Sequence, residues 1–436
     1  MVSNVASWLL PILGAKMILQ PCGAAAVGRR DSANASAIQS LLSILPTATP
    51  TSPEQAQSAL ESIFTSPTPA SLLTALGDVV EAGLTPNNVE SAISYLEGPL
   101  TGEDSTFNIN LRSPYPAAYP KAESNDAPYD LSEATLRAAI YIPSTFQYGA
   151  SGAPQPIILV PGTGNTGFDS FSGNYIQLLQ DSKIADPVWL NIPGQLLNDI
   201  QTNAEYVAYA INYIYGISNR RSVSVLSWSQ GGVDAQWAYK YWPSTRSKVT
   251  DQISFSPDYK GTTLASFAAT PHEPLPPSVL QQQYNSQFIT TLRSNEGDSA
   301  YVPTTTIYSG FYDEVVEPQQ GTGASAYLLD ARNVGVTNNE VQTICPGQPA
   351  GGFFGHEGVL YNNLGYALAV DALQHDGPGQ VARLDLPSVC SYPITEGLNL
   401  ADVLETENTL LIAGLSILLY PSPSSTEPAI KSYARS

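Results

Sequence analysis

Charged side chains are scarce in this sequence of 436 residues, and basic ones especially so. Only 13% of the residues are charged, with 18 Lys and Arg against 38 Asp and Glu, which gives a formal net charge of −20 at pH 7. A surface of that sign repels a phosphate backbone, so nucleic acids and other anionic polymers are excluded as partners. Hydrophobic residues make up 43%, enough for a large core, which excludes a disordered chain.

Cysteine is rare too, with 3 in the chain. The cysteines lack the CxxC spacing of structural zinc sites, and no metal site is expected. Cys22 lies in an apolar segment near the N-terminus that would be lost on processing, which leaves Cys345 and Cys390 as an even pair. From composition alone, a disulfide and two separate buried thiols are equally good interpretations of that pair.

No hydrophobic run is long enough to cross a bilayer. The stretch "TLLIAGLSILLY" near the C-terminus is too short for that and predicts a buried helix instead. Residues 1–26, "MVSNVASWLLPILGAKMILQPCGAAA", have an apolar segment that ends in small residues, which is the layout of a signal peptide. Lys16 interrupts that segment, so an unprocessed terminus is the alternative. A signal peptide would make this a secreted, extracellular protein.

Residues 27–130 differ in character from the rest of the chain. Three Ser/Thr-Pro pairs, Ser52-Pro53, Thr68-Pro69 and Thr85-Pro86, each precede apolar residues at helical spacing. Each pair predicts a helix N-cap followed by proline in the first turn. A Pro- and Tyr-rich stretch without periodicity then follows and predicts a linker or strap. We interpret 27–130 as a helical propeptide or cover, with a merely structural appendage as the alternative.

Residues 131–436 alternate between short apolar runs and helical patterns. This alternation predicts an α/β domain, with a mostly parallel sheet covered by helices on both faces. A long helix is expected around residues 203–216. The expected strands are "RAAIYIPS", "QPIILVPG", "PVWLNIPG", "SVSVLSWS", "DQISFSP", "TTTIYSG" and "EVQTIC". Chemistry in such sheets lies at the carboxyl ends of the strands.

One strand end carries a candidate nucleophile. In "VLSWSQGGVDAQW" an apolar run stops at Ser229, and Gly231 follows at the start of a plausible helix. This resembles the nucleophile elbow G-x-S-x-G, in which a sharp turn lifts the serine hydroxyl above the sheet. Ser227 stands where the first glycine is usual. It is small enough to be tolerated, but the motif alone is weak evidence.

A serine nucleophile needs a base, and the chain has only 3 histidines to supply one. The α/β-hydrolase order of Ser, then Asp, then His selects among them. Asp313 follows the strand "TTTIYSG" and is the candidate acid, so His272 comes too early in the chain. His375 has the setting of a helix C-terminus. His356, in a glycine-rich loop, is therefore the best candidate base.

The loop "IILVPGTGNTG" closes the second expected strand. Its backbone N–H groups and Thr163 could face an anionic oxygen, as in an oxyanion hole. A plain tight turn or a phosphate loop are the alternatives. The loop has neither the lysine of a Walker motif nor the GxGxxG spacing of a dinucleotide site, which weakens the phosphate interpretation.

These motifs together resemble the fungal lipase B family. The stretches that carry the resemblance are "LVPGTGNTG", "SWSQGGVDAQW", "FSPDYKGT", "VPTTTIYSGFYDEVVEP" and the His356 loop, and it covers about residues 150 to 433. It implies an α/β-hydrolase fold and a serine esterase or lipase that acts on acylglycerol-type esters. No cofactor is implied. The expected partners are an ester or lipid substrate and a lipid–water interface, with the protein a monomer.

The resemblance also assigns roles to individual residues. Ser229 would be the nucleophile, Asp313 and His356 its triad partners, and Thr163 and Gln230 the oxyanion donors. Residues expected near the substrate pocket are Trp228, Asp258, Thr262 and Gln282, and the expected disulfide joins Cys345 to Cys390.

Some residues depart from the family pattern. Asp234 replaces an apolar residue, and Glu317 replaces a glutamine beside the catalytic acid. If Glu317 folds back towards His356, its charge would raise the pKa of the imidazole; a solvated surface glutamate is the alternative. Two other functional hypotheses remain open: another serine acyltransferase or peptidase, or a catalytically silent relative that only binds its ligand.

Overall fold

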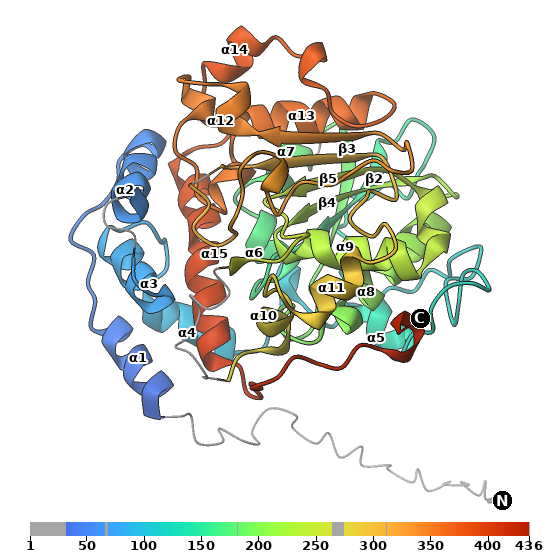
Figure 1. The fold of residues 1–436 in the computed structure, drawn as a ribbon, viewed down its shortest axis with the longest axis horizontal. Helices are drawn as coiled ribbons and strands as arrows, with labels where there is room; N and C mark the ends of the chain where they lie inside the picture. The colour runs from blue at the N-terminus through green and yellow to red at the C-terminus, as the bar shows by residue number, and fades with distance from the viewer. Residues whose placement is uncertain (1–31, 66–68, 181, 264–273, 311, 436) are drawn as a thin grey trace, which may run out of the picture.

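The centre of the molecule is a seven-stranded sheet (Figure 1). The computed structural model describes residues 32–65, 69–180, 182–263, 274–310 and 312–435, so the predicted signal peptide lies outside the described residues. The strand order is β1-β3-β2-β4-β5-β6-β7, with β1 antiparallel to β3 and the other pairs parallel. The strands are β1 Ile140–Tyr141, β2 Gln155–Val160, β3 Ala185–Leu190, β4 Val223–Trp228, β5 Val249–Phe255, β6 Thr304–Tyr308 and β7 Val336–Glu340. The predicted α/β class is confirmed.

Helices cover both faces of this sheet because its central strands are apolar on both sides. Ile157 and Leu159 of β2 belong to one core cluster and Ile158 and Val160 to another, as the two-residue period of a strand requires. The first cluster includes residues of α6, α7, α13 and α15, and the second includes residues of α8 and α9. The helices from residue 131 onwards are α5 Glu133–Ala138, α6 Gly167–Phe171, α7 Tyr175–Leu179, α8 Ile200–Ile217, α9 Gln230–Tyr241, α10 Pro277–Gln281, α11 Gln287–Arg293, α12 Val341–Ile344, α13 Asn363–Gln374, α14 Leu386–Cys390 and α15 Leu400–Leu419.

Both outer strands differ from the prediction. The strand expected at 340–345 is instead the polar stretch "VTNNE" of β7, and the apolar residues after it form helix α12. β7 lies at the edge of the sheet, where most of its residues are only partly buried, so an apolar run is not required there. At the other edge, the predicted strand "RAAIYIPS" begins as the end of α5 and pairs only through Ile140 and Tyr141.

The N-terminal region forms helices α1 Ser32–Leu42, α2 Pro53–Thr65, α3 Leu72–Glu81 and α4 Val89–Glu97. Ser52 caps α2 as expected, since its Oγ accepts the Gln55 N–H at 3.3 Å. The cap predicted at Thr85 is wrong, because Asn88 caps α4; α3 is capped by Ser71. The Thr85 hydroxyl donates instead to the carbonyl of residue 87, so that Thr-Pro pair forms a turn ahead of the helix. Thr68 lies outside the described residues.

These N-terminal helices pack against α15, beside the sheet in Figure 1. Gly414 allows α3 to come close, because a Cβ there would lie 2.5 Å from Leu76 Cδ1. Leu411 and Leu415 are fully buried, so the helix predicted from "TLLIAGLSILLY" is a core element. Among the helices that the structure describes, none has both the length and the apolarity to cross a membrane.

Candidate active site

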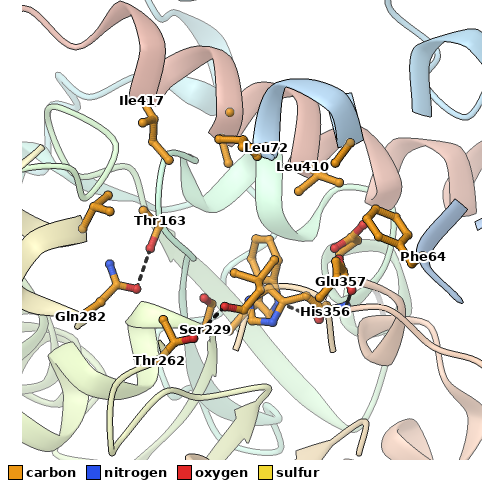
Figure 2. A pocket seen from close by; sticks show the side chains of 17 residues that line it. Phe64, Leu72, Thr163, Ser229, Thr262, Gln282, His356, Glu357, Leu410 and Ile417 are labelled. Carbon is orange, nitrogen blue, oxygen red and sulfur yellow. Dashed lines mark hydrogen bonds between the residues drawn. The ribbon is translucent and has the colours of Figure 1, made fainter. Parts of the chain in front are cut away.

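Ser229 lies in the turn between β4 and α9. Its φ of 54° and ψ of −130° are rare for a residue with a side chain. The turn is tight: a Cβ on Gly231 would lie 2.5 Å from the carbonyl oxygen of Pro161, so only glycine fits there. The sequence thus forms the strained strand-to-helix turn that the elbow motif describes. This turn presents Ser229 at the floor of a pocket (Figure 2).

Ser227 shows why the first glycine of the motif is dispensable here. Its side chain is fully buried. The Oγ accepts a hydrogen bond from Gln252 Nε2 at 2.8 Å and lies 3.1 Å from Ser254 Oγ on the neighbouring strand. These hydrogen bonds compensate for the free-energy cost of removing the Ser227 hydroxyl from water.

Asp313 and His356 are in direct contact. His356 Nδ1 lies 3.0 Å from both carboxylate oxygens of Asp313. The loop after β6 orients this carboxylate, since Asp313 Oδ1 accepts the N–H groups of Val315 at 3.1 Å and Val316 at 2.7 Å. His356 lines the same pocket as Ser229. The structure therefore brings together the three residues predicted to form a triad.

The other histidines lie elsewhere. His375 follows the last residue of α13, as expected for a helix C-terminus, and its Nδ1 is 3.2 Å from Asp371 Oδ1. His272 lies outside the described residues.

Negative charge surrounds His356. Burial lowers its pKa, but the charge and hydrogen bond of Asp313 and the charges of Glu314 and Asp258 raise it, and the net shift is upward. The Glu314 carboxylate is particularly close, because its Oε2 accepts the backbone N–H of His356 at 2.9 Å. The sequence offered Glu317 as a second carboxylate only if it folds back, with a solvated surface glutamate as the alternative. The groups that raise the pKa of His356 are Asp313, Glu314 and Asp258.

Thr163 and Gln230 lie on either side of the nucleophile turn. Gln230 is the first residue of α9, so its N–H is one of those without an intrahelical partner. The Thr163 hydroxyl lies 2.9 Å from Gln230 Oε1 and 3.2 Å from Gln282 Oε1. Gln230 Nε2 in turn donates to the Leu196 carbonyl at 2.9 Å. This network positions both side chains, and the single proton of the Thr163 hydroxyl, which points to a glutamine oxygen here, has to turn if it is to reach an oxyanion.

The pocket above Ser229 is mainly apolar away from these groups (Figure 2). Of the expected pocket residues, Trp228, Thr262 and Gln282 line it, whereas Asp258 does not. The N-terminal helices and α15 contribute the rest of one wall. From them, the lining residues are Phe64, Leu72, Ala75, Leu410, Ala413, Gly414 and Ile417.

Two comparisons with known proteins place this arrangement in a family, although no family model matches the chain. Lipase B from Pseudozyma antarctica is 36% identical over 293 residues, which are 65% of this chain and 80% of that protein. The crystal structure of Aspergillus fumigatus lipase B matches with a TM-score of 0.83 and 48% identity, over 92% of this chain and 94% of that one. This chain belongs to the lipase B family. The predicted resemblance is confirmed.

Two aspartates, Asp234 and Asp258, are fully buried in the interior of this lipase B family member. Burial raises the pKa of Asp258 to about 7. Burial, together with the charge of Asp258, also raises the pKa of Asp234 well above its usual value. Among the described residues, no side chain or backbone group meets hydrogen-bond geometry with either carboxyl group, although Gln230 lies near enough to Asp234 to oppose part of the rise in its pKa. Asp234 is therefore expected to be protonated at neutral pH, whereas Asp258 loses its proton in that range; protonation removes most of the cost of burying each group.

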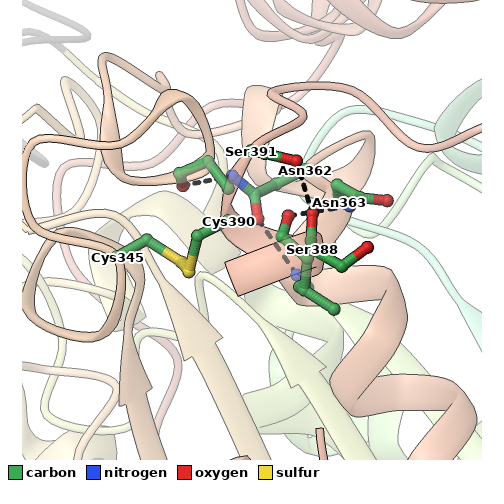
Figure 3. Close-up of a disulfide and its surroundings, with 9 residues drawn as sticks. Cys345, Asn362, Asn363, Ser388, Cys390 and Ser391 are labelled. Atoms are coloured by element: carbon green, nitrogen blue, oxygen red, sulfur yellow. Dashed lines mark hydrogen bonds between the residues drawn. A yellow bond between two sulfur atoms is a disulfide. The ribbon is translucent and has the colours of Figure 1, made fainter. Parts of the chain in front are cut away.

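The disulfide joins Cys345 and Cys390 as expected and closes a segment that contains His356 (Figure 3). Asn362 supports the same region, because its Nδ2 donates to the Ala350 carbonyl at 2.9 Å and its Oδ1 accepts the Gly365 N–H at 3.0 Å. The histidine loop of this lipase B family member is thus tied to α13 and α14.

Two kinds of pocket residue were not predicted from the sequence. The first is the acidic neighbour of each triad partner, Glu314 after Asp313 and Glu357 after His356, and both line the pocket. Their adjacency in "YDEV" and "GHEG" was a usable signal. The second is the wall from α2, α3 and α15, which sequence spacing could not reveal.

Proposed function

We propose that this lipase-type carboxylic ester hydrolase cleaves acylglycerol-type esters through an acyl-enzyme formed on Ser229. The observation that carries the proposal is the 3.0 Å contact of His356 Nδ1 with Asp313, beside a serine in a strained elbow. Asp313 would hold the imidazole with Nε2 facing the pocket and stabilise the imidazolium as it forms.

In the proposed reaction, His356 Nε2 removes the Ser229 proton as the oxygen attacks the ester carbonyl. The oxyanion is bound by the N–H of Gln230 and by the N–H and hydroxyl of Thr163, each donor contributing about 3 kcal/mol. The imidazolium then protonates the leaving alcohol. Water, activated by the same histidine, hydrolyses the acyl-enzyme and restores Ser229.

A chain-length series of p-nitrophenyl esters, assayed with and without an oil interface, tests this function. We expect turnover of esters and little turnover of matched anilides. Preferential cleavage of the anilides would favour a peptidase, and net transfer to an added alcohol in place of water would favour an acyltransferase. Binding without turnover of any ester would identify a catalytically silent relative.

We also propose that residues 27–130 cover the pocket. The support is that Phe64 of α2, with Leu72 and Ala75 of α3, forms part of the pocket wall. Limited proteolysis between residues 100 and 130, followed by separation of the fragments, tests this role. Unchanged ester hydrolysis and chain-length preference in the separated catalytic fragment would exclude a cover and leave a structural appendage.

A lipid–water interface is the proposed site of action. In the strap after α4, Phe107, Ile109 and Leu111 are exposed by 82%, 80% and 86%, respectively. On the opposite side of the strap, Asn108 and Asn110 donate to carbonyl groups of α5 and β1 at 2.9 and 2.8 Å, so the apolar side chains are held outwards. Residues 105–122 contain no Asp or Glu, unlike the acidic chain as a whole. Three side chains offer too little area for a stable dimer but enough for contact with lipid.

Replacing Phe107, Ile109 and Leu111 together by serine should therefore weaken adsorption to triolein droplets and leave hydrolysis of a soluble ester unchanged.

We further propose that the protein is secreted and that it acts as a monomer. The Cys345–Cys390 disulfide supports secretion, because disulfides persist in oxidising environments. Sedimentation of the secreted protein tests the oligomeric state.

A further inference from the structure

Three glutamates from distant parts of the chain lie close to one another beside His356. Glu314 follows Asp313, Glu357 follows His356, and Glu407 lies on α15. The Glu357 carboxyl group lies close to those of Glu314 and Glu407, and both neighbours influence its pKa. Glu357 and Glu407 are each 1% exposed. Figure 2 shows Glu357 beside His356 at the edge of the pocket.

Both ends of this carboxyl chain are anchored. At one end, Glu314 Oε2 accepts the backbone N–H of His356 at 2.9 Å. At the other end, the Tyr361 hydroxyl donates to Glu407 Oε1 at 2.7 Å. The chain therefore runs from the triad loops to α15, which also carries the pocket-lining Leu410.

Two ionised carboxylates cannot hydrogen-bond to each other, so each carboxyl–carboxyl link requires a proton. Burial is the largest cause that raises the pKa of all three groups, and it brings that of Glu407 to about 7. The other groups that influence these pKa values are the three glutamates themselves, Asp313, His356 and Tyr361. Asp313 adds further negative charge, and none of these groups is a permanent cation. No metal-binding group of His, Cys, Asp or Glu exists among the residues described. Shared protons therefore have to neutralise the chain.

We propose that Glu357 and Glu407 are positioning residues that share a proton and thereby fasten the His356 loop to α15. This inference rests on the proposed function, because the group being positioned is the proposed base. The contact keeps the imidazole in place relative to Ser229 while the pocket wall stays closed. Neither glutamate exchanges a proton with the substrate.

A pH dependence follows from this link. As pH rises, the shared proton is lost and two buried anions face each other across the loop and α15. The groups that face this pair are Glu314 and Asp313 from the loop after β6, and His356 and Tyr361 from the histidine loop. Because these groups supply no permanent positive charge, the repulsion is uncompensated and the link opens. A triad with a neutral histidine stays active at alkaline pH, so a reversible alkaline fall in kcat is the specific sign of the link.

Glutamine replacements separate hydrogen bonding from titration. The double variant Glu357→Gln/Glu407→Gln keeps neutral donors and acceptors at every pH. We expect the alkaline fall of its kcat for a soluble p-nitrophenyl ester, measured relative to its own value at neutral pH, to disappear. Glu407→Ala removes the link and should lower kcat by about tenfold or more with KM little changed. Glu405→Gln, on the same helix beside Ser172, is the matched control and should keep the wild-type profile.

The proposal is overturned by a wild-type kcat that stays level through the alkaline range, or by a double variant whose profile superimposes on that of wild type. If Glu407→Ala does not fold, the alkaline kcat profiles of the double glutamine variant and of Glu405→Gln still test the proposal. Ser229→Ala keeps the two hypotheses distinct. If Ser229→Ala retains hydrolysis, the proposed function fails; if it is inactive and the alkaline profiles superimpose, only the positioning role fails.

Discussion

The Tyr95 hydroxyl on α4 donates to Asp169 Oδ1 on α6 at 2.9 Å. Asp169 in turn completes the capping box of α6 with Thr166, in the loop that carries Thr163. This hydrogen bond joins the N-terminal helices to the element beside the proposed oxyanion hole. The N-terminal region is therefore attached to the catalytic domain at a polar point as well as along the apolar surface of α15.

Removing this bond should loosen α4. A buried hydrogen bond contributes about 1 kcal/mol, so Tyr95→Phe should speed amide hydrogen exchange in α4 by about fivefold. Tyr115→Phe provides the control, since Tyr115 is 74% exposed. Equal exchange rates in α4 for wild type and Tyr95→Phe would show that apolar packing alone holds the helix.

The triad predicts a large loss of activity on truncation. Ser229→Ala and His356→Ala should each reduce ester hydrolysis by several orders of magnitude, because triad members act as a unit. An organophosphate should label Ser229 in the wild-type protein. Near-wild-type turnover in either variant, or labelling of a different serine, would reject the assignment.

Buried carboxyl groups should make the protein more stable in mild acid than in alkali. Burial raises the pKa of Asp258 and of Glu407 to about 7, from ordinary values of 3.8 and 4.5. Stability from these groups is complete below their unfolded pKa and is lost as pH rises through the folded one. The free energy of unfolding should therefore be higher at about pH 5 than at about pH 8, by about 2 kcal/mol or more. Urea titrations of wild type and Asp258→Asn measure this, and the variant should show the smaller difference. Equal pH dependence in the two proteins would contradict the role of Asp258.

The disulfide should stabilise the histidine loop. Cys345 and Cys390 are separated by 45 residues, and closing a loop of that length contributes about 4 kcal/mol in the chain-entropy model. The variant Cys345→Ser/Cys390→Ser should therefore unfold at a lower denaturant concentration. Wild-type protein reduced under native conditions is the companion measurement. If neither form loses stability, the loop is held by contacts such as those of Asn362 instead.

Strand ends were the predictable part of this molecule. Ser229 follows β4 and Asp313 follows β6, which are parallel strands separated in the sheet by β5, so their carboxyl ends lie at the same edge. The polar strand β7 was not predictable from apolar runs, because a strand at the edge of a sheet does not need to be apolar. The cap of α4 was not predictable from Thr85-Pro86, because that pair forms a turn ahead of the helix. The fold class therefore followed from local pattern, and the errors lay at edges and boundaries.

Contacts between distant segments set the limit of prediction. Phe64 and Ile417 share one pocket wall, and Glu357 meets Glu407, although no local period relates the members of either pair. These pairings depend on how α2 and the histidine loop pack against α15. No short sequence motif indicates that packing. Glu314 was accessible in principle because it adjoins Asp313, but the choice between Glu314 and Glu317 required the path of the loop.

The backbone of Ser229, with φ at 54°, gives that residue a thermodynamic meaning of its own. Glycine adopts such a conformation without steric cost, whereas serine there destabilises the fold by about 1 kcal/mol or more. A fold selected for stability alone would favour glycine in the turn. Serine at this point therefore makes the fold less stable than it could be, a disadvantage for which the proposed chemistry of its hydroxyl compensates.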